Sequence, residues 1–189
     1  QHQGYCGSCW AHSAASAYTD RHCIELLKKV SSIPNNASYT FSAYDLLSCS
    51  KENGCKGGRA VEAYRWIETN GICTGTDYPL KDVGAVGGEA NIEKQLKNGP
   101  VSAAFVVYED FNAYTDGVYR HVTGKVKGGH AVVIVGYGTA TCNKEKIPFW
   151  IIRNSWGPKW GKGGFFYIRR GKDECNIETR GIAYATPKI

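Results

Sequence analysis

The sequence contains no methionine and no apolar run long enough to cross a membrane. A transmembrane helix needs about 20 predominantly apolar residues, so we expect no membrane span and no membrane partner. Because the 189 residues start at Gln1 and lack methionine, we also expect a processed or trimmed product in which no signal peptide remains. The length suffices for one large domain or for two small ones that share a face.

Like charges do not form blocks in this sequence, although 23 Lys and Arg residues outnumber 17 Asp and Glu residues. A nucleic-acid-binding surface would show a basic stripe with interleaved aromatic residues, and no such stripe occurs. The net charge of +6 is therefore expected to be spread over a solvated surface, and nucleic acid is not an expected partner.

A second Cys-x-x-Cys and a His-x-His pattern are also missing, so Cys6 and Cys9 lack the partners of a zinc site. No hydrophobic strand precedes the two cysteines, as it would in a thioredoxin-like redox pair. Zinc and redox chemistry stay open as alternatives, but we expect no metal and no cofactor. Eight cysteines and the glycosylation sequon at Asn36 favour an oxidising compartment.

The hydrophobic pattern divides the chain into a helical half and a strand half. Helices are predicted over residues 10–29, 42–47, 60–70 and 89–96, and strands over 101–108, 131–137, 147–153, 165–168 and 182–185. Helices followed by strands are typical of an α+β protein, here with a cleft between two lobes. We expect these lobes to comprise residues 1–100 and 101–189.

The segment QGYCGSCW at residues 3–10 leads directly into the first predicted helix. Ser8 is a good N-cap residue, which would put Cys9 in the first helical turn. There the helix dipole and the free amides favour the thiolate, which is the nucleophilic form of cysteine. The side-chain amide of Gln3 could donate a hydrogen bond to an oxyanion beside the sulfur. Cys9 is therefore the candidate nucleophile.

A cysteine nucleophile needs a base, and the base needs a group that orients it. His12 follows Cys9 on the same helix, where a base would leave no room for substrate, so we expect a packed or surface role for His12. His130 opens one predicted strand, and the next strand ends just before Asn154. In a hairpin centred on residue 142, His130 and Asn154 lie opposite one another within hydrogen-bond reach. We expect them to be the base and its orienting partner.

These motifs resemble those of papain-like cysteine proteases. Gln3, Cys9, His130 and Asn154 match the family's oxyanion glutamine, nucleophile, base and orienting asparagine, and NSWG and GHAVVIVGYG stand in the family's order. The segments GVYRHVTG, KNGPV and GFFYIRRGKD are most similar to cathepsin B-like enzymes, whereas YCGSCWAH is also similar to cathepsin Z. The resemblance implies a papain-like α+β fold, with a helical left lobe, a β-barrel-like right lobe and the active site between them.

The resemblance also implies an activity and its partners. We expect a monomeric cysteine endopeptidase that works through a thiolate–imidazolium pair and a thioacyl-enzyme. Peptide substrates, the protein's own prodomain and cystatin-type inhibitors are the implied partners, in a lysosome or vacuole or outside the cell. The alternative is an inactive protease-like binding protein. That class usually replaces the nucleophile or the base, whereas both are intact here.

Two departures from the resembling enzymes matter. Cathepsin B carries a His-bearing insertion that occludes the cleft and makes it a dipeptidyl carboxypeptidase, but residues 71–98 of this chain contain no His. We therefore expect cleavage of internal bonds. Family members usually have some two dozen residues before the nucleophile, where this chain has eight.

The resemblance assigns further residues to substrate binding. They are Gly57, Gly58 and Arg59 in a substrate loop, Gly129 and Ala131 beside His130, Trp156 as a cover over the catalytic pair, and Arg180. In the family, the residue five places after the Cys of the C-terminal C-x-I motif floors the pocket for the second residue upstream of the scissile bond. Here that residue is Arg180, with Arg59 on the wall, so an acidic or polar substrate residue is expected. The alternative, in which Arg180 pairs with Glu178 or points to solvent and Arg59 turns away, stays open.

Disulfide connectivity does not follow from the sequence alone. The resemblance implies a Cys6–Cys55 bridge and favours a second bridge, Cys49–Cys73. It assigns no partners to Cys23, Cys142 and Cys175.

Overall fold

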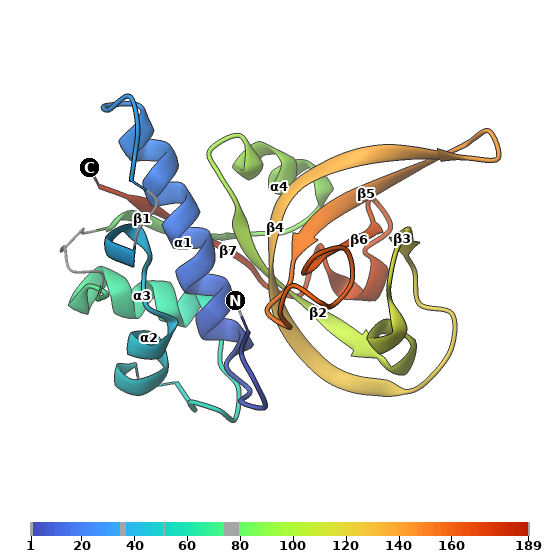
Figure 1. Cartoon of the computed structure of the whole chain (residues 1–189), viewed down its shortest axis with the longest axis horizontal. Helices are drawn as coiled ribbons and strands as arrows, with labels where there is room; N and C mark the ends of the chain where they lie inside the picture. The colour runs from blue at the N-terminus through green and yellow to red at the C-terminus, as the bar shows by residue number, and fades with distance from the viewer. Residues whose placement is uncertain (1, 35–36, 51, 74–79, 189) are drawn as a thin grey trace.

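The structure is a computed structural model that describes residues 2–34, 37–50, 52–73 and 80–188 (Figure 1). Its helices are α1 (Cys9–Leu27), α2 (Ala43–Cys49), α3 (Ala60–Asn70) and α4 (Glu89–Leu96), with the 3-10 turns η1 (Ala37–Tyr39), η2 (Glu109–Ala113) and η3 (Glu174–Asn176). Its strands are β1 (Leu80–Val86), β2 (Val101–Tyr108), β3 (Val118–Tyr119), β4 (Val126–Cys142), β5 (Glu145–Arg153), β6 (Phe165–Arg169) and β7 (Ile182–Pro187). Within these ranges, no helix is long and apolar enough to cross a membrane.

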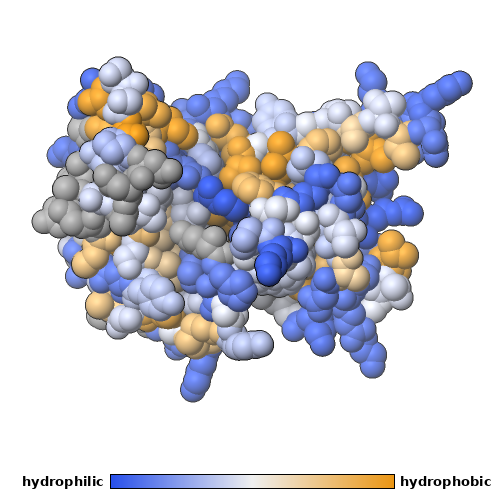
Figure 2. Space-filling model, viewed as in Figure 1, coloured by the Kyte–Doolittle hydropathy of each residue, from blue (hydrophilic) through white to orange (hydrophobic). Residues whose placement is uncertain are grey.

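The strands form one sheet in the order β1-β7-β2-β4-β5-β6-β3, in which only the β3–β6 pair is parallel. Strands β4 and β5 make a long hairpin whose tip projects from the molecule, while α1, α2 and α3 lie together at the other end (Figure 1). Hydrophilic residues occur on all sides of the visible face, with groups of hydrophobic residues between them (Figure 2). The predicted α+β class is confirmed.

Two separate clusters of buried side chains form the core. One lies within the sheet and includes Phe105, Phe111, Trp150 and Phe166. The other lies among α1, α2 and α3, and it also takes in alanines of β4 and β7, so the last strand returns to the helices. A cleft lined by Cys9 and His130 lies between elements of these two clusters.

Contacts of Arg21 and Arg153 join α1 to segments that border the sheet cluster. Arg21 of α1 is 1% exposed, and its guanidinium donates to Pro100 O at 2.6 Å and to Gly99 O at 3.0 Å. These carbonyls follow α4, where unpaired carbonyl groups attract a cation. Asp20 of α1 forms an ion pair of 2.7 Å with Arg153 of β5. The helix that carries Cys9 is therefore tied at two points to the part of the chain that carries His130.

The sequence-based prediction misses β1 and the short β3, and it makes β4 too short. The helical half also contains β1, which pairs with β7 from the other end of the chain. Its segment LKDVGAV has little local strand signal, because its partner is distant in sequence. Strand β4 is also longer than predicted, and it extends on both sides of the apolar run at residues 131–137.

Candidate active site

Cys9 is the first residue of α1, as predicted, but Ser8 does not cap the helix with its side chain. The Ser8 hydroxyl is buried without a hydrogen-bond partner, and its backbone has φ −98° and ψ 15°, outside the extended region usual for capping. Instead, the Ser8 carbonyl accepts hydrogen bonds from Ala11 N at 3.0 Å and His12 N at 3.1 Å. Backbone hydrogen bonds alone therefore define the start of the helix, without a side-chain cap from Ser8.

The Cys9 sulfur has opposing influences on its ionisation. Burial raises the pKa of the Cys9 thiol, because a charge is poorly solvated there. Hydrogen bonds from the backbone amides of Ala131, Trp10 and Cys9 itself lower this pKa, but the effect of burial is larger. The amides at the helix start thus face the sulfur as expected, yet they do not by themselves make Cys9 a thiolate.

The predicted contact between His130 and Asn154 is present, although the predicted hairpin register is wrong. His130 Nε2 lies 2.7 Å from Asn154 Oδ1, and both side chains are buried. The hairpin pairs Cys142 with Glu145, and a bulge near Gly136 shifts the pairing, so that the register sets Val133 opposite Arg153. Its continuation would put Val132 opposite Asn154, two residues from the predicted position. Since side chains alternate with a period of two, the error keeps His130 on the correct face.

The His130 ring is enclosed on two sides. Trp156 stacks on it with ring centroids 4.9 Å apart, as expected for a cover that excludes water. Phe105 contacts it edge-on at 6.0 Å. Burial lowers the pKa of His130 to about 4, and the hydrogen bond that His130 Nε2–H donates to Asn154 Oδ1 acts in the opposite direction. Burial thus disfavours an isolated charge on His130 as well as on Cys9.

Gln3 is fixed by contacts that the sequence did not reveal. The Ser155 hydroxyl donates to Gln3 Oε1, while Gln3 Nε2 donates to Cys6 O at 2.9 Å. The Gln3 backbone N–H also donates to Ser155 O at 2.9 Å, and His2 pairs with Trp156. A primary amide nitrogen carries two hydrogens, so one N–H of Gln3 is left over.

Ser155 contacts both Gln3 and Asn154. Its backbone N–H donates to Asn154 Oδ1 at 2.8 Å, and its hydroxyl holds the amide of Gln3. The only signal in the sequence is that a serine directly follows Asn154 within NSWG. Nothing in that motif indicates that the hydroxyl would reach the other end of the chain.

The structure brings three of the four predicted catalytic residues to one open cleft of about 270 Å³. Cys9 enters from α1, His130 from β4 and Gln3 from the N-terminal segment, and Trp156 also lines the cleft. Asn154 lies behind His130, in a position to orient it. The remaining lining residues are Gly7, Val107, Asn112, Lys127, Gly128 and Gly129.

A second pocket of about 130 Å³ contains most of the predicted substrate-binding residues, namely Gly58, Arg59, Ala131 and Arg180. Gly58 must be a glycine, because a Cβ there would lie 2.7 Å from the Trp10 ring. Gly57 precedes it with φ +107°, and Gly129 lines the catalytic cleft instead of this pocket. The other walls are small apolar residues, with no carboxylate among the described lining residues.

The two arginines of this pocket differ in their surroundings. Arg59 forms an exposed ion pair of 3.2 Å with Glu62, so it turns along α3. Arg180 does not pair with Glu178, whose buried carboxylate accepts from Trp150 Nε1 at 2.9 Å. The Arg180 guanidinium instead approaches Gly129, where an added Cβ would be 3.4 Å from its Nη2. Within the described chain, Arg180 has no carboxylate in ion-pair range.

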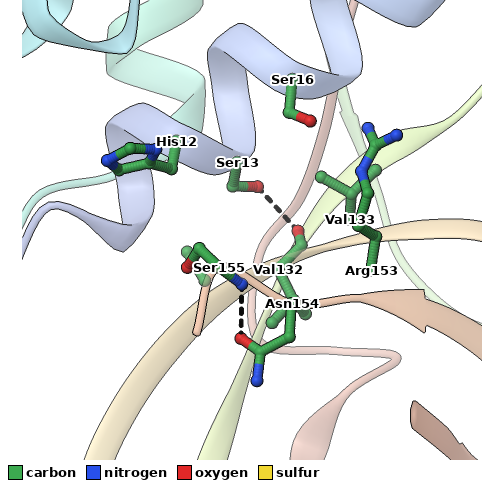
Figure 3. A pocket seen from close by; sticks show the side chains of 9 residues that line it. His12, Ser13, Ser16, Val132, Val133, Arg153, Asn154 and Ser155 are labelled. Carbon is green, nitrogen blue, oxygen red and sulfur yellow. Dashed lines mark hydrogen bonds between the residues drawn. The ribbon is translucent and has the colours of Figure 1, made fainter. Parts of the chain in front are cut away.

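His12 lines a different cavity from His130. This cavity, of about 30 Å³, lies between α1 and the strands, with Ser13 and Ser16 on the helix side and Arg153 and Ser155 opposite (Figure 3). Ser13 Oγ donates to Val132 O at 2.7 Å across it. His12 is half-buried, which agrees with the packed role expected for it.

The cysteines agree only in part with expectation. The Cys6–Cys55 disulfide is present. The expected Cys49–Cys73 bridge is not formed, and Asp45 binds both residues: it accepts the Cys73 N–H at 3.0 Å and a hydrogen bond that raises the pKa of the Cys49 thiol. Cys23, Cys142 and Cys175 are not disulfide-bonded. The Asn36 sequon lies outside the described residues.

Known proteins match this chain along its length. The profile described as papain family cysteine protease matches residues 1–95 and 81–185. A gut-specific cysteine proteinase from Caenorhabditis elegans is 37% identical, over 96% of this chain and 66% of its own length. Cathepsin B-like cysteine proteinase 2 from Haemonchus contortus is 34% identical, over 93% and 65%. The chain thus spans about two thirds of the length of these curated relatives.

Two solved protein structures have the same overall fold as this chain. ProCathepsin B S9 from Trypanosoma congolense is similar with a TM-score of 0.85 and 34% identity, over 100% of this chain and 71% of that one. Bromelain from Ananas comosus, solved in complex with the E64 inhibitor, has a TM-score of 0.79 and 25% identity, over 98% and 92%.

Proposed function

Since the chain belongs to the papain family of cysteine proteases, we propose that it is a cysteine endopeptidase that hydrolyses peptide bonds through a thioacyl-enzyme. One observation supports this most: Cys9 at a helix start, His130 held by Asn154, and the amide of Gln3 lie around a single open cleft. The papain-like α+β fold supplies each group from a different segment. We assign residues 1–100 and 101–189 to the two lobes, although Ile92 of α4 packs in the sheet cluster and β7 returns to the helical one.

Cys9 and His130 act as an ion pair in this proposal. Burial disfavours a charge on either group alone. Transfer of the thiol proton to the imidazole places two opposite charges side by side, so each offsets the burial cost of the other. Asn154 orients the ring through Nε2, which leaves Nδ1 for the proton that comes from the sulfur.

The reaction then proceeds in two steps. The Cys9 sulfur attacks the scissile carbonyl carbon, and His130 gives its proton to the leaving amine as the peptide bond breaks. Water next attacks the thioester with His130 as base, which releases the acid and restores the thiol proton to the pair. The free N–H of Gln3 and the backbone N–H of Cys9 stabilise the oxyanion in both steps.

The enzyme cuts internal bonds in this proposal. Residues 71–98 contain no His that could cap the cleft, and the described part of this span forms β1 and α4. Among the described residues, His130 is the only histidine that lines the cleft. The end of the cleft beyond His130 is therefore open to a continuing chain.

The pocket at Arg180 favours an acidic residue at the second position upstream of the scissile bond. The side chain of Arg180 is exposed at this pocket, whose small apolar walls contain no described carboxylate to neutralise the guanidinium. A guanidinium binds a carboxylate bidentately, which adds geometric selectivity to the charge. Arg180 carries this preference, since Arg59 is already engaged by Glu62.

The proposal extends to partners and compartment. ProCathepsin B S9 was solved as a proform, which supports a prodomain for this enzyme too. Cystatin-type inhibitors would enter the same open cleft. The Cys6–Cys55 disulfide supports a lysosomal, vacuolar or secreted location, since such bonds persist in oxidising compartments. The enzyme acts as a monomer on peptide and protein substrates.

Covalent labelling by E64 tests this function. The wild-type protein should take up one equivalent of inhibitor on Cys9, with loss of peptide hydrolysis, whereas Cys9→Ala should take up none. Peptide mapping by mass spectrometry identifies the labelled residue. A protein that binds peptides but neither hydrolyses them nor reacts with E64 would instead be an inactive binding protein.

A further inference from the structure

Lys127 is the extra residue at a bulge in the sheet beside the catalytic cleft. In the β2–β4 pair, Val107 lies opposite Gly128, but the next residue, Tyr108, lies opposite Val126. Lys127 is therefore left without a partner on β2. Bulges of this kind re-aim a side chain and are frequent next to active sites. Here Lys127 lines the same cleft as Cys9.

The charge of Lys127 is not neutralised by its neighbours. No ion pair within the described residues includes it, and no carboxylate lines the cleft there. The two nearby acids on η2 are engaged elsewhere. Glu109 accepts the backbone N–H of Lys125 at 3.0 Å, and Asp110 accepts from Val122 N at 2.8 Å. The exposed amide of Asn112 is a second hydrogen-bonding group that lines the cleft.

The position of Lys127 along the cleft assigns it to one side of the substrate. Along the β2–β4 pair, the Arg180 pocket is lined by Ala103, Ala104 and Ala131. The cleft is lined by Val107 and residues 127–130. The Arg180 guanidinium approaches Gly129, so Lys127 lies at the end of the cleft farther along β4 from the Arg180 pocket. If the Arg180 pocket receives the part upstream of the scissile bond, the Lys127 side receives the departing part.

We propose that Lys127, together with Asn112, binds a carboxylate of the substrate within two residues downstream of the scissile bond. This inference rests on the proposed protease function and adds a second acidic preference to it. The carboxylate has two sources, an Asp or Glu side chain or the C-terminus of a short substrate. An ammonium group attracts either one as a point charge.

The test is a series of internally quenched peptides with the same upstream sequence. One set carries Glu, Gln or Lys at the first or the second downstream position, with an amidated C-terminus six residues away. A second set ends two residues after the scissile bond, either as the free acid or as the amide. All are assayed with wild type, Lys127→Gln and Lys127→Arg. Lys125→Gln is the matched control, because it removes the same charge two residues away and outside the cleft.

For wild type, we expect kcat/KM for the better Glu peptide to exceed that of its Gln twin by about fivefold. This ratio should fall with rising salt, which screens the charges. Lys127→Gln should bring this ratio to about one, Lys127→Arg should keep it, and Lys125→Gln should leave it near the wild-type value. A preference for the free acid that Lys127→Gln removes would identify the C-terminus as the source. It would also overturn the proposed cleavage of internal bonds, while the cysteine protease chemistry stands.

Equal cleavage of charged and neutral twins by wild type would overturn the inference while the protease function stands. The same conclusion follows if the preferences survive in Lys127→Gln. Failure to cleave any peptide, together with failure to react with E64, would overturn the protease function and the inference with it.

Discussion

His130 Nε2 lies 2.7 Å from Asn154 Oδ1 although the two residues are not direct neighbours across the β4–β5 hairpin. They form a diagonal pair, and side chains of this length reach across such a distance on one face of a sheet. Asn154 also accepts the backbone N–H of Ser155, so its carboxamide is held at one oxygen by two donors. Asn154 therefore fixes the orientation of the His130 imidazole from the side away from the cleft.

Asn154→Ala should lower kcat/KM by roughly 5- to 150-fold, because a buried hydrogen bond worth about 1–3 kcal/mol is lost and His130 is free to rotate. The loss should be smaller than that caused by Cys9→Ala or His130→Ala, since Asn154 exchanges no proton. Steady-state kinetics at constant active-site concentration, titrated with E64, would measure it. An Asn154→Ala enzyme as inactive as His130→Ala would argue that Asn154 does more than orient the ring.

Ser155→Ala should lower kcat by about fivefold with little change in KM, since it removes one hydrogen bond of about 1 kcal/mol from Gln3. The Gln3 amide would then be held at Cys6 O alone. A double-mutant cycle with Gln3→Ala checks the route of the effect. Ser155→Ala should cost almost nothing in the Gln3→Ala background. Additive losses would show that Ser155 acts through another residue.

Arg180→Ala should abolish a preference for Glu over Leu at the second upstream position. In wild type we expect Glu to be favoured by about tenfold in kcat/KM, because the exposed guanidinium of Arg180 has no carboxylate partner and can bind a substrate carboxylate through two charge-assisted hydrogen bonds. Arg59→Ala, the matched control, should retain most of the preference, since Arg59 already pairs with Glu62. A tenfold preference of wild type for Leu, unchanged in Arg180→Ala, would contradict the basic pocket.

Asp110 should make the fold less stable in acid. Burial alone would raise the pKa of Asp110, but hydrogen bonds from Val122 N, Tyr119 Oη, Thr123 N and His121 hold it well below its usual range. A carboxyl with a depressed folded-state pKa contributes stability above its unfolded pKa of about 3.9, and this stability is lost as pH falls.

Asp110→Asn should therefore unfold about 3 °C lower than wild type at neutral pH, for a loss of about 1 kcal/mol. The difference should shrink below about pH 4, because the carboxyl of the unfolded chain is protonated there, whereas the folded carboxyl with its depressed pKa binds a proton only at lower pH. Thermal unfolding followed by circular dichroism at both pH values measures it. A difference independent of pH would mean that packing rather than charge explains the effect.

The candidate catalytic residues could be located from the sequence because their signals are local. Cys9 sits at the boundary between a turn motif and a helix, and His130 opens an apolar strand, so each is marked by its own neighbours. The predicted register is wrong by two residues, but a shift of two leaves His130 and Asn154 on the same face of the sheet. Strand β1 was missed for the opposite reason, because only its distant partner β7 gives it strand structure.

The supporting contacts were not predictable, because they join segments that are far apart in the sequence. Ser155 reaches Gln3 across 152 residues, and no pattern in either segment announces the other. The Cys49–Cys73 bridge was expected from family resemblance alone. In the structure, the carboxylate of Asp45 binds both cysteines, and nothing in the sequence indicates these contacts.

The pH dependence of Cys9 alkylation by iodoacetamide tests most directly whether His130 makes Cys9 a thiolate. In papain the His-paired cysteine has a pKa of roughly 3–4. We predict that the wild-type protein already reacts rapidly at about pH 5. In His130→Ala the rate should rise only above pH 9.0, because burial raises the pKa of an unpaired Cys9 thiol. The control His12→Ala should follow wild type. A wild-type rate that climbs only above pH 9.0, as in His130→Ala, would contradict the ion pair on which the proposed mechanism depends.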